Sequence, residues 1–454
     1  MDEIDWAGHH ALAKNAAAES MVLLKNSENT LPLKKGSTVA VVGTFAKEPR
    51  FGGGGSSGVR PKQLDAPYDF IAAMADVSYA PGYDSEEPNP ALIEEACRVS
   101  RDKDAVIVMV GTTSVSESEG ADRRSLALPA SHLALLESLA KANTNIVVCN
   151  FSGAAVELAP VAKIAKAILH CGLPGEAGGS ALAELLFGDV NPSGKLSETF
   201  PVCLEQTPAY PYFPGDGDEI TYVEGLLQGY RYYDTKKIPP QYPFGYGLSY
   251  TEFTYSNLRL SNEHLHSGER LVVSLDVTNC GKMAGSEIVQ VYVCDPSSYL
   301  IRPEKELKGF ARVTVQPGET RTVDLVLDER AFAYYVPHLG RFAVESGVFK
   351  ILVAASSRDI RLEGTIQFHS SDEVRRPLTL ESSMAEFYND DRYSEVTRRI
   401  YAELQIGEDH PIFPVLSSLR LKFLPEVLAF IQIPPEVSVP YQQCILNAAS
   451  ANKD

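Results

Sequence analysis

The run Ala105-Val-Ile-Val-Met-Val110, followed closely by Ser114-Val-Ser-Glu-Ser-Glu-Gly-Ala-Asp-Arg-Arg124, decides the fold of the first part of this chain. A short run made only of apolar residues is typical of a buried parallel strand. In open α/β sheets, ligands bind at the carboxyl ends of such strands. We therefore expect Glu117 and Glu119 to lie on a loop at which chemistry is commonly placed. An acidic, solvated loop is an equally good interpretation of these residues alone.

The end of this acidic loop contains residues that shape its backbone. Gly120 allows a sharp bend beside the two carboxylates, because glycine adopts backbone angles that other residues avoid. Asp122 and Arg123 carry opposite charges, and we expect them to brace the bend by pairing with each other.

The strand at 105–110 belongs to a pattern that repeats through residues 1–202. Strands are expected at 38–42, near Val77, at 105–110, at 145–149 and at 167–170, and helices at 8–25, 89–101, 129–142 and 175–188. Strands that alternate with helices predict a mostly parallel sheet covered by helices on both faces. The fold class expected for residues 1–202 is therefore an α/β sandwich.

The composition changes after residue 202. Residues 203–252 are rich in Tyr, Pro and Gly, and we expect an ordered linker arm whose aromatic side chains pack against both neighbouring domains. Residues 253–370 contain short alternating segments such as Leu271-Val-Val-Ser-Leu-Asp-Val277. Several such strands predict a small antiparallel β-sandwich.

Residues 371–454 are expected to form a helical tail. Helix-like apolar spacing occurs at 380–387 and again at 419–431. Pro425 lies inside the second stretch, and we expect it to break or kink that helix.

Length and charge restrict the possible partners. A chain of 454 residues exceeds what one hydrophobic core supports, so two to three domains are expected. The net charge of −18 disfavours a nucleic-acid partner and leaves no polybasic patch for a membrane surface. The sequence contains no run of 18 apolar residues, so no membrane-spanning helix is expected.

The cysteines point to a reducing compartment. There are seven of them, widely spaced and without a C-x-x-C pair, so neither a disulfide framework nor a zinc site is expected. No metal and no cofactor are predicted. The amino terminus has neither a basic start nor an apolar core of a signal peptide, and we expect a cytoplasmic location.

A glycine tract follows the strand expected at 38–42. Phe51-Gly-Gly-Gly-Gly-Ser-Ser-Gly58 contains the spacing G-x-G-x-x-G at Gly53, Gly55 and Gly58. A dinucleotide-binding fingerprint must open a helix directly after its strand, and this tract does not. We expect instead a loop whose backbone approaches a ligand or a neighbouring domain.

Three further features have ordinary structural interpretations. Asp5 precedes Trp6 just before the first helix, which favours a role in capping that helix. His132 and His170 have no partner at the spacing of metal ligands, so each is expected to be a packed or surface histidine.

Taken together, several motifs resemble glycoside hydrolase family 3, the β-glucosidase-like enzymes. The matching stretches, in family order, are Ala16–Asn26 with Leu31-Pro-Leu33, Gly52–Gly58, Glu119-Gly-Ala-Asp-Arg123, Leu173–Gly179, Leu186–Leu196, Glu224-Gly, Gly229–Asp234, Tyr242–Phe253 and Arg302–Phe310. The resemblance covers about residues 8 to 370.

The resemblance implies a three-part architecture. In this family a (β/α)8 barrel carries the nucleophilic Asp, an α/β sandwich supplies the acid/base Glu in many members, and a fibronectin type III-like domain follows. This chain matches the second and third parts. A barrel needs about 200 residues, so the chain is expected to lack one. Asp5-Trp6 is similar to the surroundings of the family's nucleophile but has no barrel strand around it.

The resemblance also implies roles for residues of two loops. Glu119 matches the family's general acid/base position, directly before glycine, and Glu117 is the second candidate. The surface that faces substrate or barrel is expected to include Gly53, Gly54, Gly55, Ser56, Ser57, Asp122 and Arg123.

Two functions from different classes follow. The first is part of a retaining β-glucosidase-type hydrolase that acts on a β-linked glucoside or oligosaccharide and is either truncated or completed by a separate barrel chain. The isolated chain is then expected to be inactive. The alternative is a non-catalytic protein that retains the fold for carbohydrate contact or scaffolding.

Overall fold

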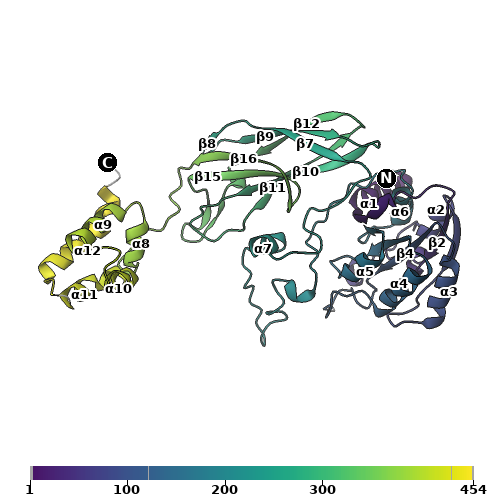
Figure 1. The fold of residues 1–454 in the computed structure, drawn as a ribbon, viewed down its shortest axis with the longest axis horizontal. Coiled ribbons are helices and arrows are strands. Elements are labelled where there is room, and N and C mark those ends of the chain that lie inside the picture. Colours follow the sequence, from purple (N-terminus) through teal and green to yellow (C-terminus); the bar gives the residue numbers. More distant parts are fainter. Residues whose placement is uncertain (1–3, 121, 431, 452–454) are drawn as a thin grey trace. The chain divides into compact units, whose positions relative to one another are not determined.

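The computed structural model of this protein describes residues 4–451 apart from 121 and 431, and it divides into two compact units. The first unit comprises Met1–Val336 and Arg341–Glu373, and the second comprises Pro337–Gly340 and Val374–Asp454. The first unit contains an α/β domain, the arm and a β-sandwich, and the second is helical, as Figure 1 shows.

The α/β domain is built on a six-stranded sheet with the order β1-β6-β5-β4-β2-β3. All neighbours pair in parallel except β1, which is antiparallel to β6 at the edge. The strands are β1 Val22–Asn26, β2 Thr38–Val42, β3 Asp76–Ala80, β4 Ala105–Gly111, β5 Ile146–Phe151 and β6 Ala167–His170. The predicted mostly parallel sheet is confirmed.

Helices cover both faces of this sheet (Figure 1). They are α1 Trp6–Ser20, α2 Pro67–Ala72 and α6 Gly178–Leu186 on one face, and α3 Pro90–Ser100, α4 Ala130–Ala142 and α5 Ala159–Ile164 on the other. Alternate residues of a strand enter opposite cores: Val39 and Val41 pack with the first group, whereas Ala40 and Val42 pack with the second. Every second side chain points to the same face of a strand, so both faces of the sheet must be apolar.

The first helix is shorter than predicted. We expected a helix over 8–25, but α1 ends at Ser20 and β1 begins at Val22. The run from Met21 to Leu24 is apolar on every side and almost fully buried, which suits a strand between two layers better than a helix with one solvated face. The predicted cap is confirmed, because Asp5 Oδ1 accepts a hydrogen bond of 2.8 Å from the Gly8 amide.

The arm is packed in its second half only. Its elements are a short 3₁₀ turn, η4 Leu204–Gln206, and the helix α7 Tyr230–Thr235. Tyr242 is buried and Tyr250 packs partly buried against the α/β core, as expected. Residues 203–229 are largely exposed, and Tyr222 keeps 74% of its surface. The prediction of a fully packed arm is therefore wrong for 203–229.

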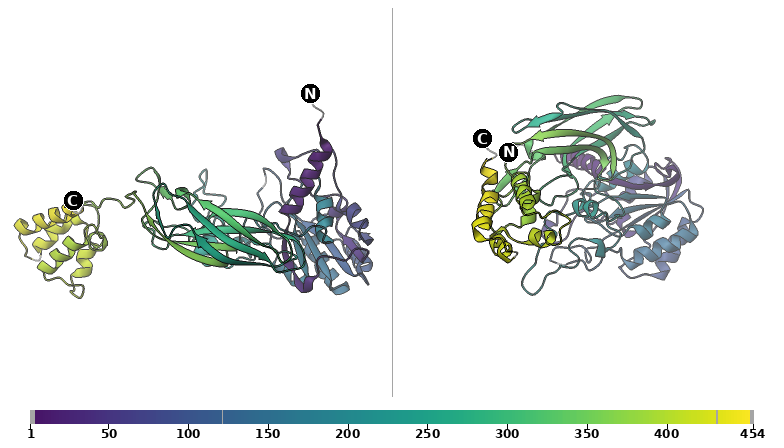
Figure 2. Two further views of the ribbon diagram at one scale, coloured as in Figure 1. Left: turned by 90° about the horizontal axis from the view of Figure 1, so that it is seen from above. Right: turned by 60° about the vertical axis from the view of Figure 1, so that its left-hand side comes forward.

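The β-sandwich confirms the predicted all-β region. A five-stranded sheet, β11-β10-β15-β16-β8, faces a three-stranded sheet, β12-β9-β7, and a hairpin pairs β13 with β14 (Figure 2). The strands are β7 Phe253–Leu260, β8 His264–His266, β9 Leu271–Asn279, β10 Gly285–Cys294, β11 Glu306–Val315, β12 Thr320–Leu327, β13 Tyr334–Val336, β14 Arg341–Ala343, β15 Gly347–Ser356 and β16 Asp359–His369. Strand β9 alternates between buried and half-buried residues, as its sequence predicts.

Polar contacts join the sandwich to the α/β domain within the first unit. Lys195 Nζ lies 3.1 Å from Glu287 Oε1, and both side chains are largely buried. Asn191 donates a hydrogen bond of 3.1 Å to the Ala284 carbonyl. A buried charge is costly unless it is paired, so these contacts fix how the two parts meet.

The second unit has a core of its own. Its helices are α8 Met384–Asn389, α9 Ser394–Glu403, α10 Phe413–Ser418, α11 Leu424–Phe430 and α12 Pro435–Ala451. The helical tail is thus confirmed, and so is the break expected at Pro425. The stretch 419–431 is not one helix: a 3₁₀ turn, η6 Leu421–Phe423, precedes α11. Pro425 lies in the first turn of α11, where its missing N–H costs no hydrogen bond.

All seven cysteines are free thiols. In the described part of the chain, no helix is both long and apolar enough to span a membrane.

Candidate active site

Three loops meet at the carboxyl edge of the sheet. They follow β2, β4 and β5, which are neighbours in the sheet. The first loop contains the glycine tract, the second contains Glu117 and Glu119, and the third contains Gly153. The structure therefore brings together the two segments that the sequence singled out.

Glu119 is bound directly by the glycine tract. The Ser56 amide donates a hydrogen bond of 2.5 Å to Glu119 Oε2. Hydrogen bonds from the Ser56 side chain and backbone lower the pKa of Glu119 below its usual value, because they favour the charged carboxylate. In this structure Glu119 is therefore ionised at neutral pH.

Close contact with the acidic loop explains two glycines of the tract, Gly54 and Gly55. A Cβ on Gly55 would lie 2.5 Å from Glu119 Cβ, and one on Gly54 would lie 2.6 Å from Ser118 Oγ. Gly55 also has a φ of +78°, which side-chain-bearing residues rarely adopt. Ser57 closes the tract by donating from its hydroxyl to the Gly54 carbonyl at 3.0 Å. The tract is a backbone surface fitted to the loop of Glu119.

Glu117 points into the protein. Its Oε2 accepts hydrogen bonds from the Thr112 hydroxyl and, at 3.1 Å, from the Gly153 amide. The Arg50 guanidinium lies 3.6 Å from the same oxygen and donates to the Glu117 carbonyl at 3.0 Å. The Glu117 side chain is thus held in place by donors from three other segments of the chain. Glu117 therefore anchors the loop, and Glu119 is the carboxylate that stays open to a ligand.

Arg123 does not form the brace that we predicted with Asp122. Its Nη1 donates instead to the Ala155 carbonyl at 3.1 Å. Burial lowers the pKa of Arg123, and the nearby carboxylates of Glu117 and Glu198 partly offset that effect. The prediction of an Asp122–Arg123 pair is wrong because the guanidinium is drawn toward buried acceptors.

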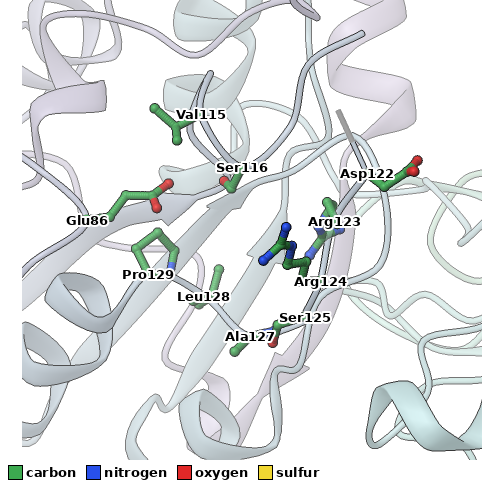
Figure 3. A pocket seen from close by; sticks show the side chains of 10 residues that line it. All are labelled: Glu86, Val115, Ser116, Asp122, Arg123, Arg124, Ser125, Ala127, Leu128 and Pro129. Atoms are coloured by element: carbon green, nitrogen blue, oxygen red, sulfur yellow. The ribbon is translucent and has the colours of Figure 1, made fainter. Parts of the chain in front are cut away.

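A cavity of about 290 Å³ lies beside the acidic loop (Figure 3). It is lined by Glu86, Val115, Ser116, Asp122, Arg123, Arg124, Ser125, Ala127, Leu128 and Pro129. In Figure 3 the carboxylate of Asp122 points away from the middle of the cavity. Glu86 is held in place by the Thr113 hydroxyl, which donates to its carboxylate. The cavity thus combines charged groups of both signs next to the candidate catalytic loop.

The two histidines considered in the sequence are structural. Burial lowers the pKa of His132 to about 3 and that of His170 to about 4. Both are therefore neutral across the physiological range. His132 accepts a hydrogen bond of 3.4 Å from the Gly111 amide, and His170 lies 3.0 Å from the amide nitrogen of Asn150.

Sequence patterns did not indicate two residues of the site. Arg50 and Gly153 belong to loops far from Glu117 along the chain, so no local motif marks them. A Cβ on Gly153 would lie 2.5 Å from Glu117 Oε1, which explains the glycine there. A basic residue directly before a glycine tract was the only available signal. Among the residues that the structure describes, no three His, Cys, Asp or Glu side chains are grouped to hold a metal ion.

Comparison with known families identifies the two parts of the first unit. The profile of the glycosyl hydrolase family 3 C-terminal domain matches residues 21–250. The chain belongs to glycosyl hydrolase family 3. A fibronectin type III-like domain matches residues 287–357. The resemblance expected from the motifs is confirmed.

Related proteins are longer than this chain. It is 45% identical over 418 residues to a thermostable β-glucosidase B from Acetivibrio thermocellus, covering 90% of this chain and 55% of the relative. It is 38% identical over 442 residues to an exo-α-(1→6)-L-arabinopyranosidase from Bifidobacterium breve, covering 93% of this chain and 58% of the relative. The chain thus spans a little over half the length of these family 3 relatives.

A solved structure has the same fold. The family 3 β-glucosidase of Bifidobacterium adolescentis superposes with a TM-score of 0.81 at 38% identity, covering 88% of this chain and 59% of that one.

Proposed function

We propose that this chain supplies the general acid/base, Glu119, of a retaining β-glucosidase-type glycoside hydrolase. The proposal is supported by one observation above all. Glu119 lies at the carboxyl edge of the sheet, is fixed by the Ser56 amide and keeps its carboxylate exposed. Glu117, the other candidate, is occupied by Thr112, Gly153 and Arg50.

The reaction needs a second carboxylate from another domain. Retaining glycosidases place a nucleophile and an acid/base about 5–5.5 Å apart. The family resemblance places the nucleophile on a (β/α)8 barrel, and the described residues of this chain form no such barrel. We propose that a barrel, on the same polypeptide or on a separate chain, covers the edge that carries Gly52–Gly58 and Ser114–Arg124.

The ionisation of Glu119 supports this dependence. A general acid must carry a proton near neutral pH, but hydrogen bonds from Ser56 lower the pKa of Glu119 here. A covering domain would remove water and bring a second carboxylate close, and both effects raise a carboxyl pKa. We expect the isolated chain to hydrolyse nitrophenyl glycosides no faster than a buffer control, because no covalent glycosyl intermediate can form.

The relatives suggest two substrate classes for this chain. A β-linked glucoside is the first candidate, since the Acetivibrio thermocellus relative is a β-glucosidase. An α-L-arabinopyranoside is the second, since the Bifidobacterium breve relative is an arabinopyranosidase of similar coverage.

The test is a chimera in which the part of the Acetivibrio thermocellus β-glucosidase without a counterpart here is joined to residues 1–454. We expect it to release nitrophenol from an aryl β-glucoside or an aryl α-L-arabinopyranoside. Glu119→Gln should lower the rate about 10²–10⁴-fold, the usual value of general acid–base catalysis. Glu137→Gln, at an exposed position on α4, serves as the matched control and should leave the rate unchanged.

Each outcome separates the candidates. A rate unchanged by Glu119→Gln would remove Glu119 from the chemistry. A folded chimera without activity that still binds oligosaccharide would favour the alternative of a non-catalytic, carbohydrate-contacting protein.

A further inference from the structure

The exposed first half of the arm, residues 203–229, has an unusual surface. We call this segment the arm loop; it is the teal loop beside α7 in Figure 1. Within residues 202–226 lie eight large apolar side chains that remain exposed: Val202, Tyr210, Tyr212, Phe213, Ile220, Tyr222, Val223 and Leu226. Single exposed apolar residues are normal, but a concentration of them marks an interaction surface.

The carboxyl-terminal end of the arm loop leads into α7, and α7 is bound to the β-sandwich. Asp234 lies 3.0 Å from Lys305 Nζ and 2.7 Å from Arg358 Nε, and the Asp234 and Lys305 side chains are buried. The Tyr230 hydroxyl accepts a hydrogen bond of 2.8 Å from the Leu307 amide, and its ring stacks on Phe244 with the centroids 4.6 Å apart. The carboxyl-terminal end of the arm loop is therefore fixed to the β-sandwich.

The other end of the arm loop is fixed to the α/β domain. The Phe200 amide donates to the Tyr242 carbonyl at 2.9 Å, and the two residues form a bridge. Both ends of the arm loop are thus set before any partner arrives. Ends that are fixed in advance reduce the entropy lost on binding, so the loop is suited to docking.

The charge of the arm loop indicates which kind of partner its surface fits. The arm loop contains five carboxylates, Glu205, Asp216, Asp218, Glu219 and Glu224, and no lysine or arginine. A symmetric contact between two copies places the same patch against itself, which here would bring two acidic loops together. The surface fits instead a different domain, with an apolar centre and a basic rim.

We infer that the arm loop is a docking surface for the nucleophile-bearing (β/α)8 barrel of the family. The inference rests on the proposed function, and it adds a contact surface separate from the Glu119 edge. It accounts for the exposed aromatic side chains, because the relatives contain about 42–45% of their length beyond the part that this chain matches. In the assembled enzyme the arm loop would join the β-sandwich, the α/β domain and the barrel.

Hydrogen–deuterium exchange of the isolated chain and of the chimera described above tests the inference. We expect the amides of 207–228 to exchange at least about 10-fold more slowly in the chimera, as expected for backbone that becomes covered. The turn at Gln316–Glu319 on the far end of β11 serves as the internal control and should not change. In the chimera, Tyr222→Ser combined with Leu226→Ser should restore fast exchange. Ile301→Ser, at a still more exposed apolar residue elsewhere, should not.

Two results would overturn the inference. The first is equal exchange of the arm loop in the isolated chain and the chimera. The second is self-association of the isolated chain in sedimentation that Tyr222→Ser abolishes, since that would assign the surface to a second copy. A protected arm loop in a chimera whose rate ignores Glu119→Gln would instead overturn the proposed function and leave this inference in place.

Discussion

Arg50 and Glu117 join two loops that are 67 residues apart in the sequence: Arg50 Nη2 lies 3.0 Å from the Glu117 carbonyl oxygen and 3.6 Å from its carboxylate. Both side chains are largely buried, with 11% and 19% of their surface exposed. The pair therefore fixes the acidic loop relative to the glycine tract, and Glu119 with it.

Arg50→Met should destabilise the chain by about 1–3 kcal/mol, the usual cost of leaving a buried polar group without its hydrogen bond. Urea unfolding of the isolated chain measures this difference. Arg124→Met, an exposed arginine on the acidic loop, is the matched control and should change stability by less than about 0.5 kcal/mol. Equal effects of the two substitutions would show that the Arg50–Glu117 pair does not hold the loops together.

Alanine substitutions at Gly55 and Gly120 distinguish the stability cost of backbone strain from the cost of crowding Glu119. Both have a positive φ, +78° and +79°, but only Gly55 faces Glu119, while no atom lies within 4 Å of a Cβ on Gly120. Gly120→Ala should cost about 1–2 kcal/mol for the left-handed backbone alone. Gly55→Ala should cost about 1–3 kcal/mol more, because the methyl group crowds the Glu119 side chain. Equal losses in unfolding free energy would contradict the close fit of tract and loop.

His10 should make stability depend on pH. Its ring nitrogens lie 3.0 Å from Glu176 and 3.1 Å from Asp65, and together these segments join α1 to the turn before α6. Burial alone would lower the pKa of His10, but hydrogen bonds to both carboxylates and their negative charge raise it above its ordinary 6.5. The folded state therefore favours the imidazolium. This contribution is complete below pH 6.5 and is lost as pH rises through the higher pKa of the folded state.

Asp65 sets the lower pH limit of the range in which the same cluster stabilises the fold. Burial would raise its pKa, but hydrogen bonds from Ser180, Gln63 and His10 lower it below its ordinary 3.8. Its contribution is present above pH 3.8 and is lost as pH falls through the lower pKa of the folded state. Thermal unfolding of wild type and His10→Gln should therefore differ most between these limits and converge at alkaline pH. His9→Gln, at the exposed neighbouring position, is the matched control and should change stability by less than about 0.5 kcal/mol.

The sequence predicted the elements that depend on local pattern. The apolar runs at 38–42, 105–110 and 167–170 became strands β2, β4 and β6, because each needs a buried environment on both faces. Helix α1 was predicted too long since alanine-rich sequence and a buried edge strand meet at Met21 without a turn signal.

The site was only partly predictable, for a physical reason. Glu119 and the glycine tract stand out by composition, and the sheet order brings them together. The anchors of Glu117, Arg50 and Gly153, come from loops after other strands, so only the fold shows that they converge. The exposure of residues 203–229 could not be predicted either, since aromatic side chains in a sequence do not show whether the surface that covers them is present.

The second unit should unfold separately from the first. Among the residues that the structure describes, twelve buried side chains of α8 to α12 and their connections form one core, which shares no residue with the core of the β-sandwich. A helical unit of this size has a small core and is expected to be the less stable part. Urea unfolding should show two transitions, and a chain ending at Glu373 should keep the major one within about 0.5 kcal/mol, as for independent sites.

Phe387→Ala should abolish the minor transition alone, since removing a buried phenylalanine costs about 3–5 kcal/mol. The matched variant Phe368→Ala, in the core of the β-sandwich, should shift only the major transition. A single transition that both substitutions shift together would show that the two units fold as one.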